Sequence, residues 1–205
     1  MRQFCFHALL IASLGSAAFS TLSAALLVPA QAADSASQTA APQGLSEDSV
    51  SSLFSSLRKE RDSQKARVLA NEIVGEWNDS GSATINLLMK WSEEASGEKR
   101  KAAAYDFLDQ AILLKPNYAQ AWYRRALVHY ADGDTRKAMA DLNTTLEKEP
   151  RFFPALASLA NILESGERNE LALKVWEQYL ALYPADKEAQ KEADDISEKL
   201  AGTRS

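Results

Sequence analysis

Residues 119–152 (AQAWYRRALVHYADGDTRKAMADLNTTLEKEPRF) contain the pattern that governs the architecture of this chain. The same pattern recurs at a constant spacing, once before this stretch and once after it. The equivalents of Trp122, Ala126, Ala138, Leu142 and Pro150 are Leu88, Ser92, Ala104, Leu108 and Pro116 in the earlier copy, and Leu156, Ala160, Ala172, Trp176 and Pro184 in the later one. Self-similarity at a fixed period indicates a stack of similar supersecondary units. Small residues at the positions where two helices must touch predict that each unit is a helix hairpin.

The spacing of these residues resembles the tetratricopeptide repeat (TPR) family, whose repeats are about 34 residues long and follow the pattern W-x2-L-G-x2-Y…A-x3-F…P. Trp122, Ala126, Ala138, Leu142 and Pro150 match it directly or conservatively, whereas Arg125 replaces the usual Leu and His129 the usual Tyr. The resemblance covers about residues 50–186. It implies an all-α solenoid of antiparallel helix pairs whose inner groove binds a peptide or a protein. It implies no chemical reaction.

Residues 1–32 resemble a secretory signal peptide. Met1 and Arg2 precede a stretch from Gln3 to Ala33 that has no formal charge, and residues 30–32 (AQA) provide the small-x-small site of a signal peptidase. We therefore expect cleavage after Ala32 and export to the periplasm. The alternative is an uncleaved anchor, because the apolar region approaches the length that spans a bilayer.

Removal of residues 1–32 leaves residues 33–205, enough for one domain with its own core. The remaining chain has 22 basic and 28 acidic residues, a net charge of −6, which argues against nonspecific binding to nucleic acid. Cys5 lies within the predicted signal, so the exported chain has no cysteine and no disulfide framework.

Seven segments follow from the pattern. Residues 1–32 are the signal peptide, and residues 33–46, rich in Ser, Ala, Gln and Pro, are a flexible linker. Residues 47–82 form a degenerate TPR-like hairpin, for which an unrelated helical hairpin is the alternative. Three clear repeats follow at 83–118, 119–152 and 153–186, and residues 187–201 form a capping helix. In the first clear repeat, the turn at residues 96–100 (SGEKR) lacks the usual spacing.

Candidate catalytic residues are few. His129 is the only histidine after the signal, and its place in the repeat favours packing between helices over catalysis. One histidine and no cysteine do not make a usual transition-metal site. Residues 132–134 (DGD) lack the remaining ligands of a calcium loop. The sequence therefore predicts no enzyme, no metal site and no cofactor.

The inner groove offers the best candidate binding site. On the side of the first helix of each repeat that faces the groove, Lys90 and Arg124 stand at the same repeat position, beside two tyrosines. Two neighbouring cations suggest that the groove binds an acidic partner or a peptide carboxylate, although the asparagine of known TPR carboxylate clamps is missing here. Solvated surface cations are the alternative. The predicted groove residues are Asn86, Lys90, Gln120, Tyr123, Arg124, Leu127, Tyr130 and Asn161.

Two functions of different classes remain open on this sequence. The first is a non-enzymatic periplasmic adaptor of a Gram-negative bacterium that binds a protein or peptide in its groove. The second is a structural or self-associating subunit of a cell-envelope complex. An enzyme accessory or a cryptic hydrolase is the third alternative.

Overall fold

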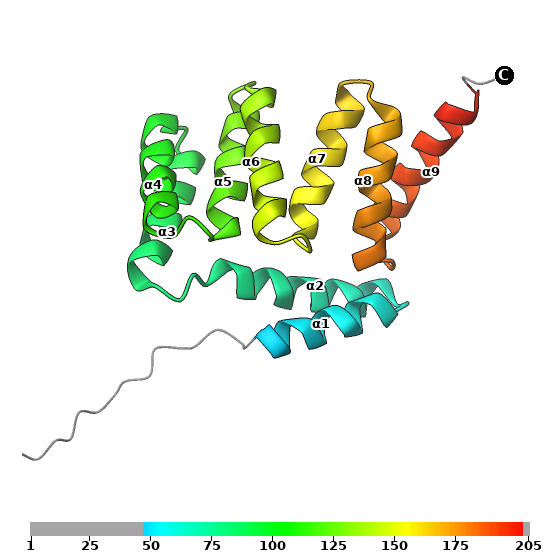
Figure 1. Cartoon of the computed structure of the whole chain (residues 1–205), viewed down its shortest axis with the longest axis horizontal. Coiled ribbons are helices and arrows are strands. Elements are labelled where there is room, and N and C mark those ends of the chain that lie inside the picture. The colour runs from blue at the N-terminus through cyan, green and yellow to red at the C-terminus, as the bar shows by residue number, and fades with distance from the viewer. Residues whose placement is uncertain (1–46, 203–205) are drawn as a thin grey trace, which may run out of the picture. The chain divides into compact units, whose positions relative to one another are not determined.

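The computed structural model of the protein describes residues 47–202, which form nine α-helices and no strand (Figure 1). The helices are α1 (Glu47–Lys59), α2 (Ser63–Asn78), α3 (Ala83–Gly97), α4 (Lys101–Leu114), α5 (Ala119–Ala131), α6 (Thr135–Lys148), α7 (Phe153–Ser165), α8 (Asn169–Leu182) and α9 (Lys187–Gly202). This confirms the prediction of an all-α solenoid. The predicted signal peptide and linker lie outside the described residues. Within residues 47–202, none of the helices combines the length and the apolarity needed to span a bilayer.

Helices α3 to α8 form three consecutive helix pairs, in which the two helices pack on each other and the second helix of a pair packs on the first helix of the next pair. The second helices of the pairs begin at Lys101, Thr135 and Asn169, which are evenly spaced along the chain. Their ends keep the same interval, and a proline follows shortly after each end, where no helical hydrogen bond can be donated. Alanines at the predicted close-contact positions are fully buried: Ala104, Ala138 and Ala172.

The turn between α3 and α4 has the same geometry as the turns in the other two pairs, so the expected difference in spacing is wrong. Lys99, Gly133 and Glu167 stand at equivalent positions, and all three have a left-handed backbone with φ of 60°, 79° and 57°. Glycine adopts this conformation without strain, whereas a residue with a Cβ does so at a cost of about 1–2 kcal/mol. The absence of glycine at this position of the first pair therefore strains the turn without changing it.

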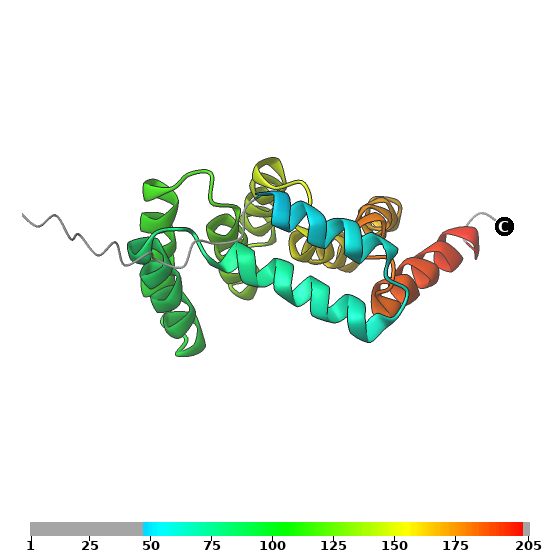
Figure 2. The same ribbon diagram turned by 90° about the horizontal axis from the view of Figure 1, so that it is seen from below.

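The hairpin of α1 and α2 does not stack on α3 as a fourth repeat. It lies across the ends of the later helix pairs, where α1 contacts α8 and α2 contacts α5 (Figures 1 and 2). The prediction of a degenerate first repeat required α2 to pack along α3, and the structure differs from it there. The alternative of a distinct helical hairpin describes this segment better.

Aromatic side chains attach the hairpin to the repeats. The Trp77 ring stacks on Phe152 with 4.3 Å between centroids, and Phe54 meets Phe153 edge-on at 6.4 Å. Phe152 ends the segment that joins α6 to α7, and Phe153 is the first residue of α7. Each such ring buries about 150–250 Å², so this cluster is a major part of the core. Polar bonds extend the contact, since Tyr118 Oη donates to the Trp77 carbonyl at 2.9 Å and Lys115 Nζ donates to the Ser80 carbonyl at 2.6 Å.

Helix α9 covers the last repeat. Its apolar stripe, Ala189, Ala193 and Ile196, is buried, and the helix packs on α8. Asp186 caps its start by accepting hydrogen bonds from the backbone N–H groups of Glu188 and Ala189 at 3.0 and 3.2 Å. The segment predicted as a capping helix at residues 187–201 is therefore a helix that packs on α8 with its apolar side buried.

Candidate functional site

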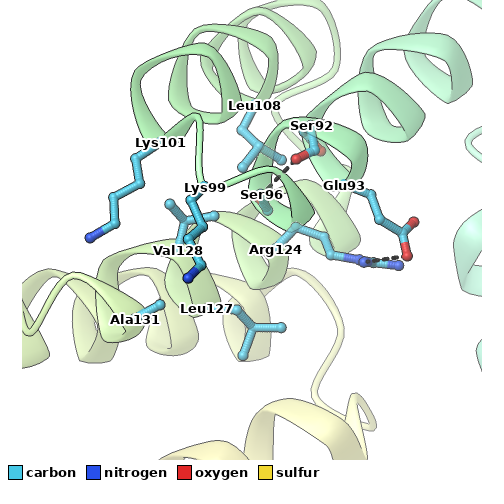
Figure 3. A pocket seen from close by; sticks show the side chains of 10 residues that line it. All are labelled: Ser92, Glu93, Ser96, Lys99, Lys101, Leu108, Arg124, Leu127, Val128 and Ala131. Carbon is cyan, nitrogen blue, oxygen red and sulfur yellow. Dashed lines mark hydrogen bonds and ion pairs between the residues drawn. The ribbon is translucent and has the colours of Figure 1, made fainter.

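The first helices of the three repeats, α3, α5 and α7, line a series of adjoining pockets. The most apolar of them, called here the α3–α5 pocket, has a volume of about 390 Å³ (Figure 3). Its lining residues are Ser92, Glu93, Ser96, Lys99, Lys101, Leu108, Arg124, Leu127, Val128 and Ala131. They come from α3, the α3–α4 turn, α4 and α5, so the pocket depends on the stacking of two repeats.

The interior of the α3–α5 pocket is apolar because its serines are already bonded within their own helix. Ser92 Oγ donates to the Met89 carbonyl at 2.6 Å, and Ser96 Oγ donates to the Ser92 carbonyl at 2.8 Å. Together with Leu108, Leu127, Val128 and Ala131, these side chains present mainly carbon to the pocket. Such a surface suits an apolar side chain of a ligand.

The rim of this pocket is mostly basic. Arg124 Nη1 lies 3.6 Å from Glu93 Oε1 on one side, while Lys99 and Lys101 stand on the opposite side (Figure 3). Lys101 also forms an ion pair with Asp132. In the described part of the chain, no carboxylate lies within ion-pair distance of Lys99. Three cations thus surround a pocket that contains one carboxylate.

A second pocket of about 380 Å³ brings together four of the predicted groove residues: Asn86, Lys90, Gln120 and Arg124. Arg124 lines this pocket and the α3–α5 pocket, so the two are neighbours. Lys90 is largely exposed and pairs with Glu94 across one helical turn at 3.8 Å. The prediction that Lys90 and Arg124 face the same space agrees with this geometry.

Two of these four residues, Asn86 and Gln120, form hydrogen bonds that stabilise the fold. Asn86 Oδ1 accepts hydrogen bonds from the Ser80 backbone N–H at 2.8 Å and from Ser80 Oγ at 2.6 Å, and its Nδ2 donates to Asp79 Oδ1 at 2.8 Å. These bonds hold the turn between α2 and α3, and the bond from Asn86 lowers the pKa of Asp79. Gln120 is only 4% exposed, and its Nε2 donates to Asn78 Oδ1 at 2.7 Å at the end of the crossing hairpin.

A third pocket of about 160 Å³ lies between α5 and α7 and contains Leu127, Tyr130 and Asn161. Leu127 also lines the α3–α5 pocket, so the series continues along the array. Tyr123, by contrast, packs its ring on Phe152 at 5.0 Å, within the core that supports the hairpin. Of the two tyrosines predicted to wall the groove, Tyr130 lies at a pocket and Tyr123 stabilises the core.

Sequence reasoning missed Lys99 and Lys101. It searched the first helix of each repeat, whereas these lysines belong to the turn and to the start of α4. The alignment of the repeats offered a signal, because Lys99 replaces the glycine of the middle repeat at a position that disfavours side chains.

His129 belongs to a polar cluster between α4, α5 and α6. Its Nδ1 lies 3.0 Å from Tyr105 Oη, which donates to Asp132 Oδ2 at 2.8 Å and therefore accepts a hydrogen bond from the imidazole. Burial and the bond to Asp132 raise the pKa of Tyr105, and bonds from Lys101 and Tyr105 lower the pKa of Asp132. The location of His129 between helices agrees with the prediction of a packed histidine.

Comparison with known proteins places the chain in a family. A TPR repeat-containing protein of Rhizobium etli is 54% identical to it over 152 residues, which are 74% of each protein. The chain belongs to the TPR family. No family model matches its sequence.

Solved TPR structures share its fold at low sequence identity. The first TPR domain of Spaghetti, bound to the HSP90 peptide SRMEEVD, superposes with a TM-score of 0.54 at 21% identity, over 58% of this chain and 95% of that one. The TPR2B domain of yeast Sti1, in a complex with pHsp70, gives 0.52 at 18% identity, over 58% and 99%. The Sgt2 TPR domain of Aspergillus fumigatus gives 0.54 at 17% identity, over 60% and 83%. The superposed part is close in length to the three helix pairs together with α9.

Proposed function

We propose that this TPR protein is a non-enzymatic adaptor of the periplasm that binds a protein or peptide along α3, α5 and α7. The supporting observation is the α3–α5 pocket, which combines an apolar interior with a rim of three cations and one carboxylate. A binding site needs a desolvated anchor and a few placed polar groups, and this pocket has both.

The composition of the rim defines the class of ligand. An apolar side chain enters the pocket, while carboxylates on the same peptide meet Arg124 on one side and Lys99 on the other. Arg124 already contacts Glu93 at 3.6 Å, a weak and partly exposed pair that a ligand carboxylate can replace. The guanidinium offers a fixed fork of donors that fits a carboxylate. The Spaghetti domain holds the peptide SRMEEVD, which contains two Glu and one Asp, so this fold can accept an acidic peptide.

Export rests on the sequence of residues 1–32. The mass of the protein recovered from a periplasmic fraction tests it, because cleavage after Ala32 gives a chain that starts at Ala33. A recovered chain that retains residues 1–32, or one found only in membranes, contradicts this part of the proposal.

The binding proposal is tested with Arg124→Ala and a matched control, Arg136→Ala. Arg136 is exposed on α6 and does not line the three pockets described above. The parent and both variants are used to capture proteins from periplasmic extract, the captured protein is identified by mass spectrometry, and its affinity is measured by calorimetry. Loss of an interfacial charge that is hydrogen-bonded commonly costs about 2–5 kcal/mol. We therefore expect Arg124→Ala to bind at least about tenfold more weakly and Arg136→Ala to bind like the parent.

Two results would contradict the proposal. Equal losses in both variants indicate general charge attraction to the protein. No loss in either variant means that the partner contacts a different face.

A further inference from the structure

The helix pair α3–α4 stands at one end of the row of repeats (Figure 1), and several large apolar side chains of this pair are exposed. Leu87 and Trp91 of α3 are 42% and 40% exposed, and Leu114 of α4 is 59% exposed. The Trp91 ring packs on Phe107 of α4 at 5.5 Å. Leu114 lies two helical turns beyond Phe107 and therefore on the same side of α4. Leu87, Trp91, Phe107 and Leu114 are called here the open face.

The other repeats show what normally covers such a face. Ala121 and Ala155 stand where Leu87 stands in the first pair, and both are fully buried. Leu159, at the position of Trp91 in the last pair, is 8% exposed. In those repeats the preceding helix pair packs against these positions. The first pair has no preceding pair among residues 47–202, because the α1–α2 hairpin lies across the ends of later helices.

We propose that a second copy of this chain covers the open face, and that the two copies meet symmetrically through α3 and α4. This inference does not depend on the α3–α5 pocket, whose α3 residues Ser92, Glu93 and Ser96 are not part of the open face, although Lys90 at the border also lines the neighbouring pocket. The proposed dimer would provide a structural basis for self-association, which the sequence suggests as the second possible function.

The opposite end of the row of repeats offers the open face no apolar surface for a head-to-tail arrangement. Helix α9 buries its apolar stripe on α8, and the residues that it exposes are mainly charged, among them Lys187, Lys191, Asp194 and Glu198. An apolar open face gains nothing against such a surface. It can be covered by the same face of another copy, which is the arrangement of a closed twofold dimer.

The charged residues beside the open face also favour a second copy of this chain as its partner. Lys90 and Glu94 border the open face and form an ion pair at 3.8 Å, and Glu98 pairs with Arg100 at 2.6 Å. The border therefore has no net charge from these four residues to repel a second copy. When two α3 helices pack antiparallel, Lys90 of one copy approaches Glu94 of the other, so the border is complementary to itself.

The size of the face sets the expected affinity. Helices of 14 and 15 residues are about 20 Å long, and two packed helices lie about 8–10 Å apart. A patch of this length and width is at or below the area of about 800 Å² per partner of a standard interface. We therefore expect a dimer with a dissociation constant in the micromolar range.

Sedimentation equilibrium of the purified protein from about 1 to 300 µM, in a range typical of weak interfaces, tests the inference. The mass should rise from one copy to two and stop there. Leu87→Glu should weaken the dimer at least about tenfold, because two carboxylates are then buried in an apolar contact. Leu171→Glu is the matched control, since Leu171 on α8 is 41% exposed, and it should dimerise like the parent. Both sites are partly exposed, so both variants should keep the parent's circular dichroism.

Charge exchange gives a second, independent measurement. Lys90→Glu and Glu94→Lys should each weaken the dimer, because like charges then meet across the interface. An equimolar mixture of the two variants should restore it, since every Glu then faces a Lys. Four results would each overturn the proposal. The parent could stay monomeric over this range, or its mass could grow past that of two copies. Leu87→Glu and Leu171→Glu could weaken the dimer equally, or the mixture of Lys90→Glu and Glu94→Lys could fail to restore it.

Discussion

Arg125 of α5 and Asp141 of α6 form a fork-to-fork ion pair, with Nε 2.8 Å from Oδ2 and Nη2 2.8 Å from Oδ1. The same guanidinium reaches Asp109 of the preceding repeat through Nη1 at 2.7 Å and stacks on the Trp122 ring at 4.7 Å. Arg125 occupies a position where the TPR pattern has Leu. The polar residue is accommodated because two carboxylates on facing helices satisfy its donors, which also raises its pKa.

Removal of Asp141 should therefore destabilise the fold more than removal of a surface partner. Breaking a buried pair from one side typically costs about 3–5 kcal/mol. Asp109 remains for Arg125, so we expect Asp141→Ala to lower the free energy of unfolding by about 2–3 kcal/mol, below that range. Asp195→Ala, which breaks the exposed pair with Lys191, should cost about 0–1 kcal/mol. Urea unfolding measures the free energy of unfolding of both variants. Equal small losses would show that the buried Arg125–Asp141 pair contributes no more stability than the exposed pair.

The double replacement Arg125→Leu with Asp141→Leu restores an apolar contact of the usual TPR type. Replacement of a buried ion pair by packed apolar residues is often neutral or stabilising by about 1–4 kcal/mol. We expect the double variant to be at least as stable as the parent in the same urea experiment. A loss larger than that of Asp141→Ala alone would indicate that the polar network, with Asp109, is needed to align the two repeats.

Ala138 on α6 should not tolerate a larger side chain. It is fully buried where α6 crosses α5, so Ala138→Leu forces the helices apart and should cost about 1–3 kcal/mol. Ala140→Leu is the control on the same helix, because Ala140 is exposed, and it should unfold like the parent. Trp176→Ala should cost about 3–5 kcal/mol, since it opens a cavity at a side chain that is 4% exposed. Parent-like unfolding of Ala138→Leu would mean that the repeat register is wrong.

The repeats could be predicted from sequence because the residues that define one repeat lie close together in the chain and occur three times. A buried alanine, a turn and a proline recur at a constant interval, and stacking follows from the apolar faces that the recurrence creates. The position of the α1–α2 hairpin could not be predicted in this way. Its apolar stripe, with Phe54 and Leu57, fits a stacked repeat and a crossing hairpin equally well. The long-range partners Phe152 and Phe153 decide between them.

The candidate site was predictable only where it lies on one helix face. Helical periodicity groups Arg124, Lys90 and Leu127 on one side of the first helices, and each of them lines a pocket in the structure. It could not show that Tyr123 turns into the core, because the hairpin supplies the neighbouring rings. It also could not bring Lys99 and Lys101 to the rim, because a turn and a second helix approach α5 only after the repeats stack.

Acid should weaken the contact between Asp132 and Lys101. The hydrogen bond from Lys101, followed by that from Tyr105, lowers the folded-state pKa of Asp132 below its ordinary value of 3.8. A carboxyl with a depressed pKa adds stability above its unfolded-state pKa, and this contribution is lost as the pH falls through the lower folded-state value. Urea unfolding from pH 6 to about pH 2.5, which spans that window, should show a shallower decline for Asp132→Asn than for the parent. Lys101→Ala should also flatten the decline, and in the Asp132→Asn background it should add no further flattening. Parallel curves for the parent and Asp132→Asn would contradict the assignment.

Lys99 offers a test in which stability and binding change in opposite directions. Its left-handed backbone, with φ of 60°, costs about 1–2 kcal/mol relative to glycine, while a glycine adds flexibility to the unfolded chain worth about 0.5–1 kcal/mol. Lys99→Gly should therefore stabilise the fold by up to about 1 kcal/mol. It should also weaken binding of the captured partner about threefold to fivefold, mainly through a slower association rate, and the loss should shrink at high salt because the charge lies on the rim.

Glu167→Gly is the matched control, because Glu167 has the same backbone conformation, φ of 57°, at the equivalent position of the last repeat. Its side chain does not line the α3–α5 pocket. We expect the same gain in urea stability from Glu167→Gly and an unchanged or slightly tighter affinity, since a negative charge is removed. This pair of variants separates the conformational strain of the turn from the charge at the pocket. If Lys99→Gly gains stability and binds like Glu167→Gly, Lys99 does not contact the partner, and the ligand carboxylates lie on the Arg124 side of the pocket alone.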